Sequence, residues 1–210
     1  SEPGAAQIIA SSSFGLAAHI LAWGGTVRDL GIARDDINDI RFKAATSEGC
    51  DVFVTLGGAS VGDHDLIQKA LIPELKVAFW KIAMRPGKPL IHGRYRATPF
   101  LGLPGNPVSA RVCAQLLLKP IIFRFLRNNA PPWRMSKVPL ASALGANDQR
   151  QDYVRCHLAV QPDGGLIAEP FPVQDSSMLR PYAAADALIV RPPGDPAKNA
   201  GEAVPVLHLD

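Results

Sequence analysis

The sequence predicts an α/β domain with a mainly parallel sheet, followed by a small all-β C-terminal domain. Up to residue 127, helical and extended patterns alternate along the chain. The apolar run 51–55 is typical of a strand buried in a parallel sheet. Beyond residue 139, β-type runs at 153–160, 165–171, 187–193 and 203–209 are separated by Pro, Gly and Asp, without a convincing helical pattern between them. We therefore expect domains at 1–127 and 139–210, joined by a linker at 128–138.

Caps and apolar patterns predict the elements of the first domain in order. Serines at 11–13 can cap a helix over 14–23, and the segment 26–32 is extended. Asp35 and Asp36 can cap a second helix over 37–47. The remaining elements are a strand at 51–55, a helix at about 65–71, and strands at 77–82, 89–93 and 99–103.

The segment 102–110, GLPGNPVSA, predicts a tight turn between a strand and a helix. Pro107 suits the first helical position, where its missing amide costs nothing, and Asn106 fits the N-cap. This helix should run to about residue 127, with Pro120 kinking or splitting it. A stiff turn at a helix N-terminus concentrates amide donors, which suits an anionic ligand. A capped helix without any ligand is the alternative.

Composition excludes several classes of protein. With 210 residues, of which 47% are hydrophobic and 20% charged, the chain can bury a core. The net charge of +3 is mild and scattered, which does not favour nucleic acid. No apolar run approaches the roughly 20 residues of a membrane span. The three cysteines, Cys50, Cys113 and Cys156, lie outside any CxxC motif and predict reduced thiols in a cytoplasmic protein.

Three loops are candidates for ligand binding, because each follows a strand and ligands of open α/β sheets bind at the carboxyl ends of strands. The first carries Gly57 and Gly58, whose backbone allows close approach, and the hydroxyl of Ser60. Asp63 and Asp65 follow it and can hold a cation or water. Helix capping by one of them is the alternative, and it is favoured for Asp63.

The second loop places Lys81, Arg85 and Lys88 within a stretch stiffened by two prolines. Fixed cations beside a turn suit phosphate or another oxyanion, and a solvated charge cluster is the alternative. The third loop is GLPGNPVSA, which brings amide donors, Asn106 and Ser109 to the same rim.

The segments GGASVGDHD, WKIAMRPGKPLIHG and GLPGNPVSA, in this order and spacing, resemble the signature of the molybdopterin molybdenumtransferases, the MoeA and gephyrin E-domain family. RQDYVRCHL and QDSSMLRPYAAADALIV match the same family in pattern. The resemblance implies a MogA-like three-layer sandwich up to about residue 127, lacking its first strand, and the C-terminal β domain of the family beyond it.

The resemblance also implies a reaction, in which molybdate is inserted into adenylylated molybdopterin with release of AMP and the help of Mg²⁺ or another divalent cation. Asp65, with Asp35 or Asp36, would serve the cation or the hydrolytic water. The implied partners are these small molecules, a second copy of the full-length chain in a homodimer, and a molybdopterin adenylyltransferase; no nucleic acid or membrane is expected. The residues that the resemblance places at the substrates are Gly57, Gly58, Ser60, Asp63, Lys81, Arg85, Lys88, Pro104, Asn106, Pro107, Ser109, Arg150 and Ser176.

The sequence departs from the family pattern in three places. Ala10 stands where a polar residue is usual, and Arg85 stands where lysine is usual. The strand and domains that precede Glu2-Pro3-Gly4 in the family are not in this sequence. We therefore expect a truncated chain with an exposed sheet edge or a gap in the sheet, and with poor activity alone.

Three other functions stay open. They are a stand-alone molybdopterin adenylyltransferase, a non-catalytic scaffold of the gephyrin kind, and a generic nucleotide or phosphosugar binder. The β tail and the MRPGKP loop argue against the first of these.

Overall fold

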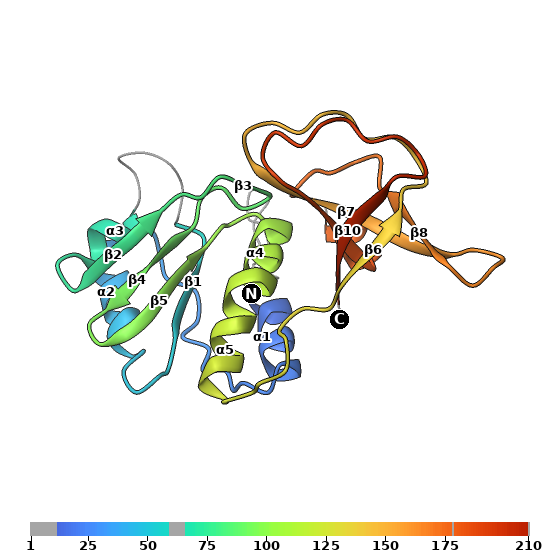
Figure 1. Cartoon of the computed structure of the whole chain (residues 1–210). Helices are drawn as coiled ribbons and strands as arrows, with labels where there is room; N and C mark the ends of the chain where they lie inside the picture. Colours follow the sequence, from blue (N-terminus) through green and yellow to red (C-terminus); the bar gives the residue numbers. More distant parts are fainter. Residues whose placement is uncertain (1–11, 59–65, 178, 210) are drawn as a thin grey trace.

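The computed structural model describes residues 12–58, 66–177 and 179–209. A four-stranded sheet lies in the first half of the chain, with the strand order β1-β5-β4-β2 (Figure 1). Its strands are β1 (Phe53–Leu56), β2 (Leu75–Trp80), β4 (Ile91–Tyr95) and β5 (Thr98–Leu103). All four were expected from the sequence, and β1 lies at one edge of the described sheet.

The expectation of a mainly parallel sheet is wrong for the described strands. Within this sheet only β1 and β5 pair in parallel, whereas β4 is antiparallel to both β5 and β2. Arg96 and Ala97 alone connect β4 to β5, with Arg96 at φ 53°. A two-residue connection joins only antiparallel neighbours, and this hairpin reverses the direction of β4. The sheet is therefore mixed.

Helices cover both faces of this sheet, giving three layers (Figure 1). Leu101 and Leu103 of β5 face the core formed with α1 (Ser12–Ala22), α4 (Pro107–Cys113) and α5 (Lys119–Phe125). Phe100, one residue out of phase, faces the opposite core, formed with α2 (Ile37–Ala45) and α3 (Leu66–Leu71). The strand period of two thus explains how one strand is buried on both sides.

The expected interruption of the long helix at Pro120 is confirmed. A π-helical turn, Ala114–Leu118, separates α4 from α5, and Pro120 lies in the first turn of α5. Proline gives up an amide and crowds the preceding turn, so the regular hydrogen-bond ladder does not continue through it. The helix ends at Phe125, close to the predicted end.

The second half of the chain forms a largely antiparallel sheet with the order β3-β7-β9-β10-β6, and β8 pairs with β7. Residues 135–138 of the expected linker are part of β6, and a short helix, α6 (Leu179–Ala183), interrupts a region expected to be all-β. The strands are β3 (Met84–Arg85), β6 (Met135–Pro139), β7 (Gln151–Val160), β8 (Leu166–Pro170), β9 (Ala187–Arg191) and β10 (Ala203–His208).

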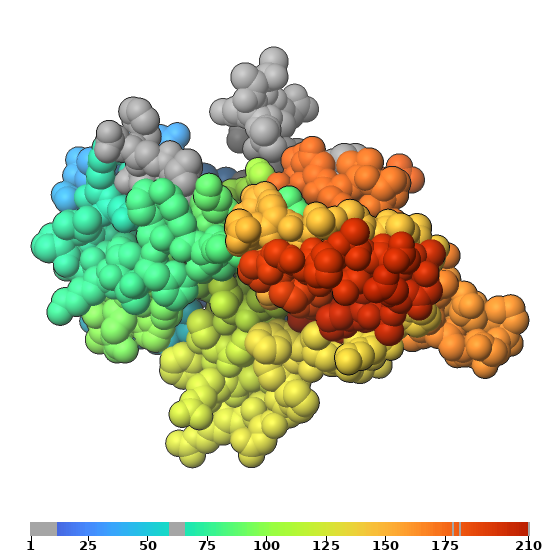
Figure 2. Space-filling model, turned by 45° about the horizontal axis from the view of Figure 1, so that its top comes forward, coloured from blue at the N-terminus to red at the C-terminus, as the bar shows by residue number. Residues whose placement is uncertain are grey.

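The two halves are joined by packing as well as by the chain. Strand β3 comes from the first half but pairs in parallel with β7, and α6 packs against α4. Tyr182, Leu188 and Leu207 belong to the same buried cluster as α4 and α5. Figure 2 shows the two halves in contact, with the hairpin between β7 and β8 projecting away from the rest.

The three cysteines are free thiols, as expected, and burial raises the pKa of both Cys113 and Cys156 to about 12. Within the described ranges, no helix is long and apolar enough to cross a membrane.

His19 on α1 should give the stability a pH dependence. Burial, followed by the charges of Arg111 and Lys119, lowers the pKa of His19 from its ordinary value of 6.5. His19 therefore binds a proton more readily in the unfolded chain than in the folded chain. The contribution of neutral His19 to stability is complete above pH 6.5 and is lost as the pH falls below this value. We expect the free energy of unfolding to fall more steeply between pH 7 and 5 in the native chain than in His19→Gln.

Urea unfolding at each pH measures this slope. Between pH 7 and 5, the loss of stability in the native chain should exceed that in His19→Gln by less than about 1 kcal/mol, because the His19 ring is only partly buried. Equal slopes for the two proteins would contradict the assignment.

Candidate functional site

The candidate site lies where three strands of the mixed sheet end. Strands β1, β5 and β2 run in the same direction, because β4 opposes both β5 and β2. Their carboxyl ends therefore meet at one edge, and each is followed by one of the three loops predicted to bind a ligand. The register places Leu56 beside Leu103, so the turn after β1 touches the turn after β5.

Glycine allows these two turns to meet. Gly57, at φ 81°, donates its amide to the carbonyl of Leu103 at 3.0 Å. A Cβ on Gly57 would lie 3.8 Å from the Cα of Gly105. Gly58 also has a positive φ, of 69°, and a Cβ there would lie 2.2 Å from Cγ1 of Ile67. Both glycines are therefore required by the backbone, and Gly58 also by the space available.

All three loops line one open cavity of about 660 Å³. We call the loop after β1 the double-glycine turn (Gly57 and Gly58), the loop after β2 the basic turn (81–89) and the loop after β5 the GLPGNPVSA turn. The sequence predicts that the three turns share a cavity, and the geometry agrees. The second half of the chain supplies a further wall. The lining residues are 57–58, 84–89, 104–106, 109, 150 and 174–176.

The three cationic side chains of the basic turn do not all lie in the same place. Lys88 and Arg85 line the cavity. Lys81 does not: its Nζ lies over the ring of Trp80, 4.0 Å from the centroid. The backbone of Lys81 turns with a φ of 67° and continues into the strand β3. The structure therefore brings two of the three predicted cations to the site.

Gly87 sits under this turn and is buried. Its φ is 114°, and a Cβ there would lie 2.4 Å from Sγ of Cys113 and 2.7 Å from Cε of Met84. The turn that carries Lys88 thus packs closely against α4, where Gly87 contacts Cys113.

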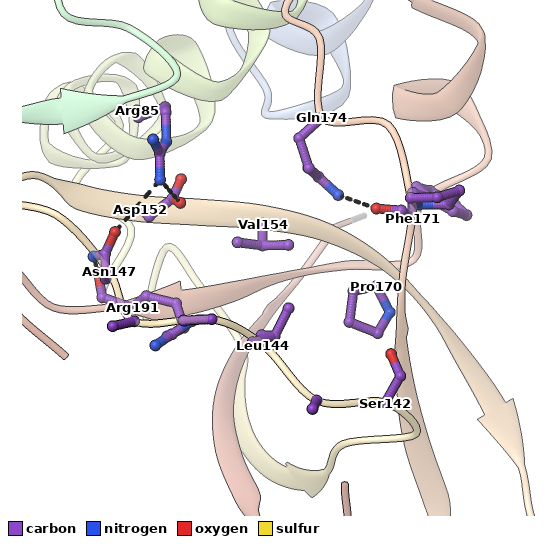
Figure 3. A pocket seen from close by; sticks show the side chains of 14 residues that line it. Arg85, Ser142, Leu144, Asn147, Asp152, Val154, Pro170, Phe171, Gln174 and Arg191 are labelled. Carbon is purple, nitrogen blue, oxygen red and sulfur yellow. Dashed lines mark hydrogen bonds and ion pairs between the residues drawn. The ribbon is translucent and has the colours of Figure 1, made fainter. Parts of the chain in front are cut away.

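Arg85 is paired with acidic side chains of the second half. It donates to Asp152 in a short contact (Figure 3). Its Nη1 also lies 3.3 Å from Oδ2 of Asp148. Asn147 accepts a longer bond, at 3.4 Å. The hydrogen bond to Asp152 raises the pKa of Arg85. Arg85 therefore joins the two halves of the chain across the rim of the cavity.

Arg150 holds the same acid. Its Nη2 donates to Asp148 at 2.6 Å and its Nε at 3.2 Å, so the Nε–Nη2 edge of the guanidinium is occupied. These bonds, with that from the Arg150 amide, lower the pKa of Asp148 to about 2.

Asn106 contacts the second half instead of capping its helix. It stands at the N-cap of α4 but makes no side-chain cap bond. Its Nδ2 donates to Oγ of Ser176 at 2.9 Å, and the Val108 amide donates to the Ser176 carbonyl at 3.2 Å. One of the amides that sequence reasoning offered to an anion is therefore already used.

A buried arginine positions the loop that carries Ser176. Arg155 on β7 is only 1% exposed. Its Nε donates to Gln174 at 3.1 Å and its Nη1 to the carbonyl of Asp175 at 2.9 Å. Gln174 also donates back to the carbonyls of Arg155 and Phe171. The loop 171–177 is thus tied to β7 before it reaches the cavity.

The predicted acids do not gather into a cation site in the described part of the chain. Asp36 accepts from the amides of Asn38 and Asp39 and so caps α2. Neither Asp35 nor Asp36 lines the cavity, and Pro107 lies at the start of α4 without lining it. Ser60, Asp63 and Asp65 lie outside the described residues, as does Ala10. Among described residues, no three His, Cys, Asp or Glu side chains come together as metal ligands.

Sequence reasoning missed several residues that shape the site. Asp148, Asp152 and Arg155 pair with or support the predicted ones, and Gln174 and Asp175 line the cavity. The motif RQDYVR holds two of them, yet only its first arginine was predicted to reach the site. No sequence pattern singles out Arg155, because alternation along β7 places it on the face opposite the apolar Val154 and Cys156, although all three residues are buried.

A second open cavity, of about 460 Å³, adjoins the first and shares Arg85 and Gln174 with it. Figure 3 shows the apolar side chains of Val154, Leu144 and Pro170 on its wall, with Arg85 and Gln174 above them in this view. The amides of Asn147 and Gln174 that line it are already bonded to backbone carbonyls.

Two family profiles match this chain. The profile described as "Probable molybdopterin binding domain" matches residues 2–124, and that described as "MoeA C-terminal region (domain IV)" matches residues 137–209. Curated relatives agree. A molybdopterin molybdenumtransferase of Haemophilus influenzae is 32% identical over 193 residues, covering 87% of this chain and 46% of the relative. That of Bacillus subtilis is 32% identical over 213 residues, covering 99% and 48%.

Solved structures agree on the fold. The molybdopterin biosynthesis MoeA protein of Pyrococcus horikosii superposes with a TM-score of 0.83 at 26% identity, covering 99% of this chain and 50% of the other. This chain therefore spans about half the length of the relatives that it matches.

Proposed function

Because this chain belongs to the MoeA family of molybdenum cofactor biosynthesis proteins, we propose that its cavity binds adenylylated molybdopterin and molybdate. The reaction proposed for the whole protein is insertion of the metal at the dithiolene, with release of AMP. The observation that supports this is the shared cavity of about 660 Å³, in which a basic turn faces two glycine-rich turns.

The chemistry of the lining suits oxyanions. Molybdate and the phosphates of an adenylylated ligand are tetrahedral, and they need cations and neutral donors held in place. Lys88 offers a compact charge, while Asn106 and Ser109 offer an amide and a hydroxyl. Gly57 and Gly58 let the backbone approach the ligand closely. Arg150 and Ser176 approach from the second half of the chain.

We divide the chain into a molybdopterin-binding domain at 1–127, a linker at 128–134 and a C-terminal domain that begins at residue 135, the first residue of β6. For the full-length protein we propose a homodimer that acts with a molybdopterin adenylyltransferase in the cytoplasm. The assisting divalent cation receives no ligand cluster from the described residues, and we propose Asp65 as its ligand.

The competing functions are less well supported. The match of residues 137–209 to the C-terminal region of MoeA favours the transferase family over a stand-alone adenylyltransferase. A scaffold role would not need Lys88 to face a cavity.

Lys88→Ala should weaken molybdate binding at least about tenfold, because one charged group in a hydrogen-bonded anion site is worth about 1.5–3 kcal/mol. Isothermal titration calorimetry with molybdate, and then with molybdopterin, measures the loss. Among described residues the Lys88 ammonium forms no ion pair, so the substitution leaves no buried partner behind.

Lys81→Ala is the matched control. It removes the same charge from the same turn, but its Nζ lies over Trp80 and outside the cavity lining. Molybdate affinity should be retained in Lys81→Ala. Unchanged affinity in Lys88→Ala would instead favour the scaffold function.

A further inference from the structure

One carboxylate bridges two arginines at the rim of the cavity. Arg85 comes from β3 and Arg150 directly precedes β7, and both line the cavity. Asp148 Oδ2 lies 3.3 Å from Nη1 of Arg85 and 2.6 Å from Nη2 of Arg150. Its carboxylate also accepts from Nε of Arg150, so it is bound in the side-on geometry that guanidinium groups use for oxyanions.

This pairing removes most of the positive charge from the cavity. Of the lining cations Arg85, Lys88 and Arg150, the two arginines are paired with Asp148, and Arg85 also with Asp152. Only Lys88 has no ion pair with a described carboxylate. An oxyanion that reaches this rim therefore meets arginines already occupied by an internal acid.

The bridge is accessible to a competing anion. The side chains of Arg85, Asp148 and Arg150 are 45%, 44% and 36% exposed. Ion pairs this exposed contribute little net stability, so the exchange of one anion for another costs little. Asp152, at 13% exposure, is the more buried partner and keeps Arg85 in place when Asp148 leaves.

We propose that Asp148 is an internal competitor for the oxyanion, occupying the subsite between Arg85 and Arg150 until the ligand displaces it. The proposal rests on the proposed function and deepens it, because it names the residue that limits the affinity of this subsite. Displacement breaks the Asp148 contacts with both guanidinium groups and transfers these donors to the oxyanion. No covalent bond changes.

Asp148→Asn tests this directly. An asparagine retains an oxygen for the amide of Arg150, which bonds Oδ1 of Asp148 at 2.8 Å, so the local turn is preserved. Exposed ion pairs are each worth up to about fivefold in an equilibrium constant, and freeing two guanidinium groups should tighten molybdate binding about tenfold. Calorimetric titration with molybdate at low ionic strength measures the change.

Two further variants separate the local effect from net charge. Asp163→Asn removes the same charge from the hairpin between β7 and β8, where the carboxylate bonds no described group other than the nearby amide of Gly165. It should leave molybdate affinity unchanged. In the double variant Asp148→Asn, Arg150→Gln most of the gain should disappear, because one of the two freed guanidinium groups is gone and the other, that of Arg85, stays paired with Asp152.

The outcomes are distinct. A gain in molybdate affinity that is seen in Asp148→Asn, absent from Asp163→Asn and mostly lost in the double variant supports the proposal. If the native chain binds molybdate but Asp148→Asn binds it no more tightly, the competitor role is wrong and the anion site stands. An equal gain in Asp163→Asn also overturns the competitor role. If none of the proteins binds molybdate, both the competitor role and the proposed anion site fail.

Discussion

Gly87→Ala is expected to lower the free energy of unfolding by about 3 kcal/mol and to abolish oxyanion binding. At φ 114° an L-residue is strained, by roughly 1–2 kcal/mol. The new Cβ would also lie 2.4 Å from Sγ of Cys113 and 2.7 Å from Cε of Met84 in a buried position, and such overpacking costs about 1–3 kcal/mol. Since Lys88 follows directly, relief of the clash moves the basic turn away from the cavity.

Urea unfolding and molybdate titration of three variants separate these causes. Gly164→Ala is the control for backbone strain alone, because Gly164 has φ 83° and a Cβ there would meet nothing within 4 Å. It should cost only about 1 kcal/mol. Adding Cys113→Ala to Gly87→Ala removes the Sγ and should restore part of the stability. If Gly87→Ala costs no more than Gly164→Ala, packing against Cys113 does not hold the turn.

Arg155→Met should lower the free energy of unfolding by about 2 kcal/mol and weaken molybdate binding about tenfold. The substitution fills much of the volume but removes the donors to Gln174 and to the carbonyl of Asp175. A partly buried carbonyl left without its partner costs about 1–3 kcal/mol. The loop 171–177 then loses its tie to β7, and Ser176 no longer meets Asn106 at a fixed distance.

Arg191→Met is the matched control, and both variants are compared by urea unfolding and by calorimetric titration with molybdate. Arg191 is also buried, at 4% exposure, and its guanidinium donates to the carbonyls of Gly145 and Pro196. It does not line the larger cavity. We expect Arg191→Met to lose stability without losing molybdate affinity. Equal losses of affinity in both variants would contradict a positioning role for Arg155.

Local rules predicted most elements of the first half. Proline at the start of a helix, aspartate at an N-cap and short apolar runs are short-range signals, and they correctly predicted α2, β1, β5 and the start of α4. The mixed sheet was missed because strand direction depends on the connection. The turn at Arg96 and Ala97 carries no glycine or asparagine to mark a hairpin.

The candidate site was predictable as a set of loops but not as a network. That the three loops meet follows from strand ends, which sequence patterns reveal. Sequence patterns do not reveal which cations remain available to a ligand, because the acids that pair with Arg85 are distant along the chain. Asp148 lies 63 residues from Arg85, and Asp152 lies 67 residues from it. The sequence therefore indicated a strongly basic rim, whereas the folded chain neutralises two of its cations.

β6 and α6 were missed for another reason. The segment that contains β6 is rich in proline near its start, which is typical of a loop, although Met135–Pro139 is held by pairing with β10. The helix α6 has only five residues, and it is stabilised by the packing of Tyr182 in the core beside α4. Tertiary contacts, rather than local preference, determine both elements.

The strand β3 is two residues long, yet it belongs to the sheet of the second half while its loop belongs to the site of the first. Any rotation of one half against the other would therefore have to pull Met84 and Arg85 off Gln151 and Asp152 before the cavity could widen. The pairing of β3 with β7 holds residues that line the cavity against the second half of the chain. The width of the cavity opening is therefore coupled to the relative orientation of the two halves.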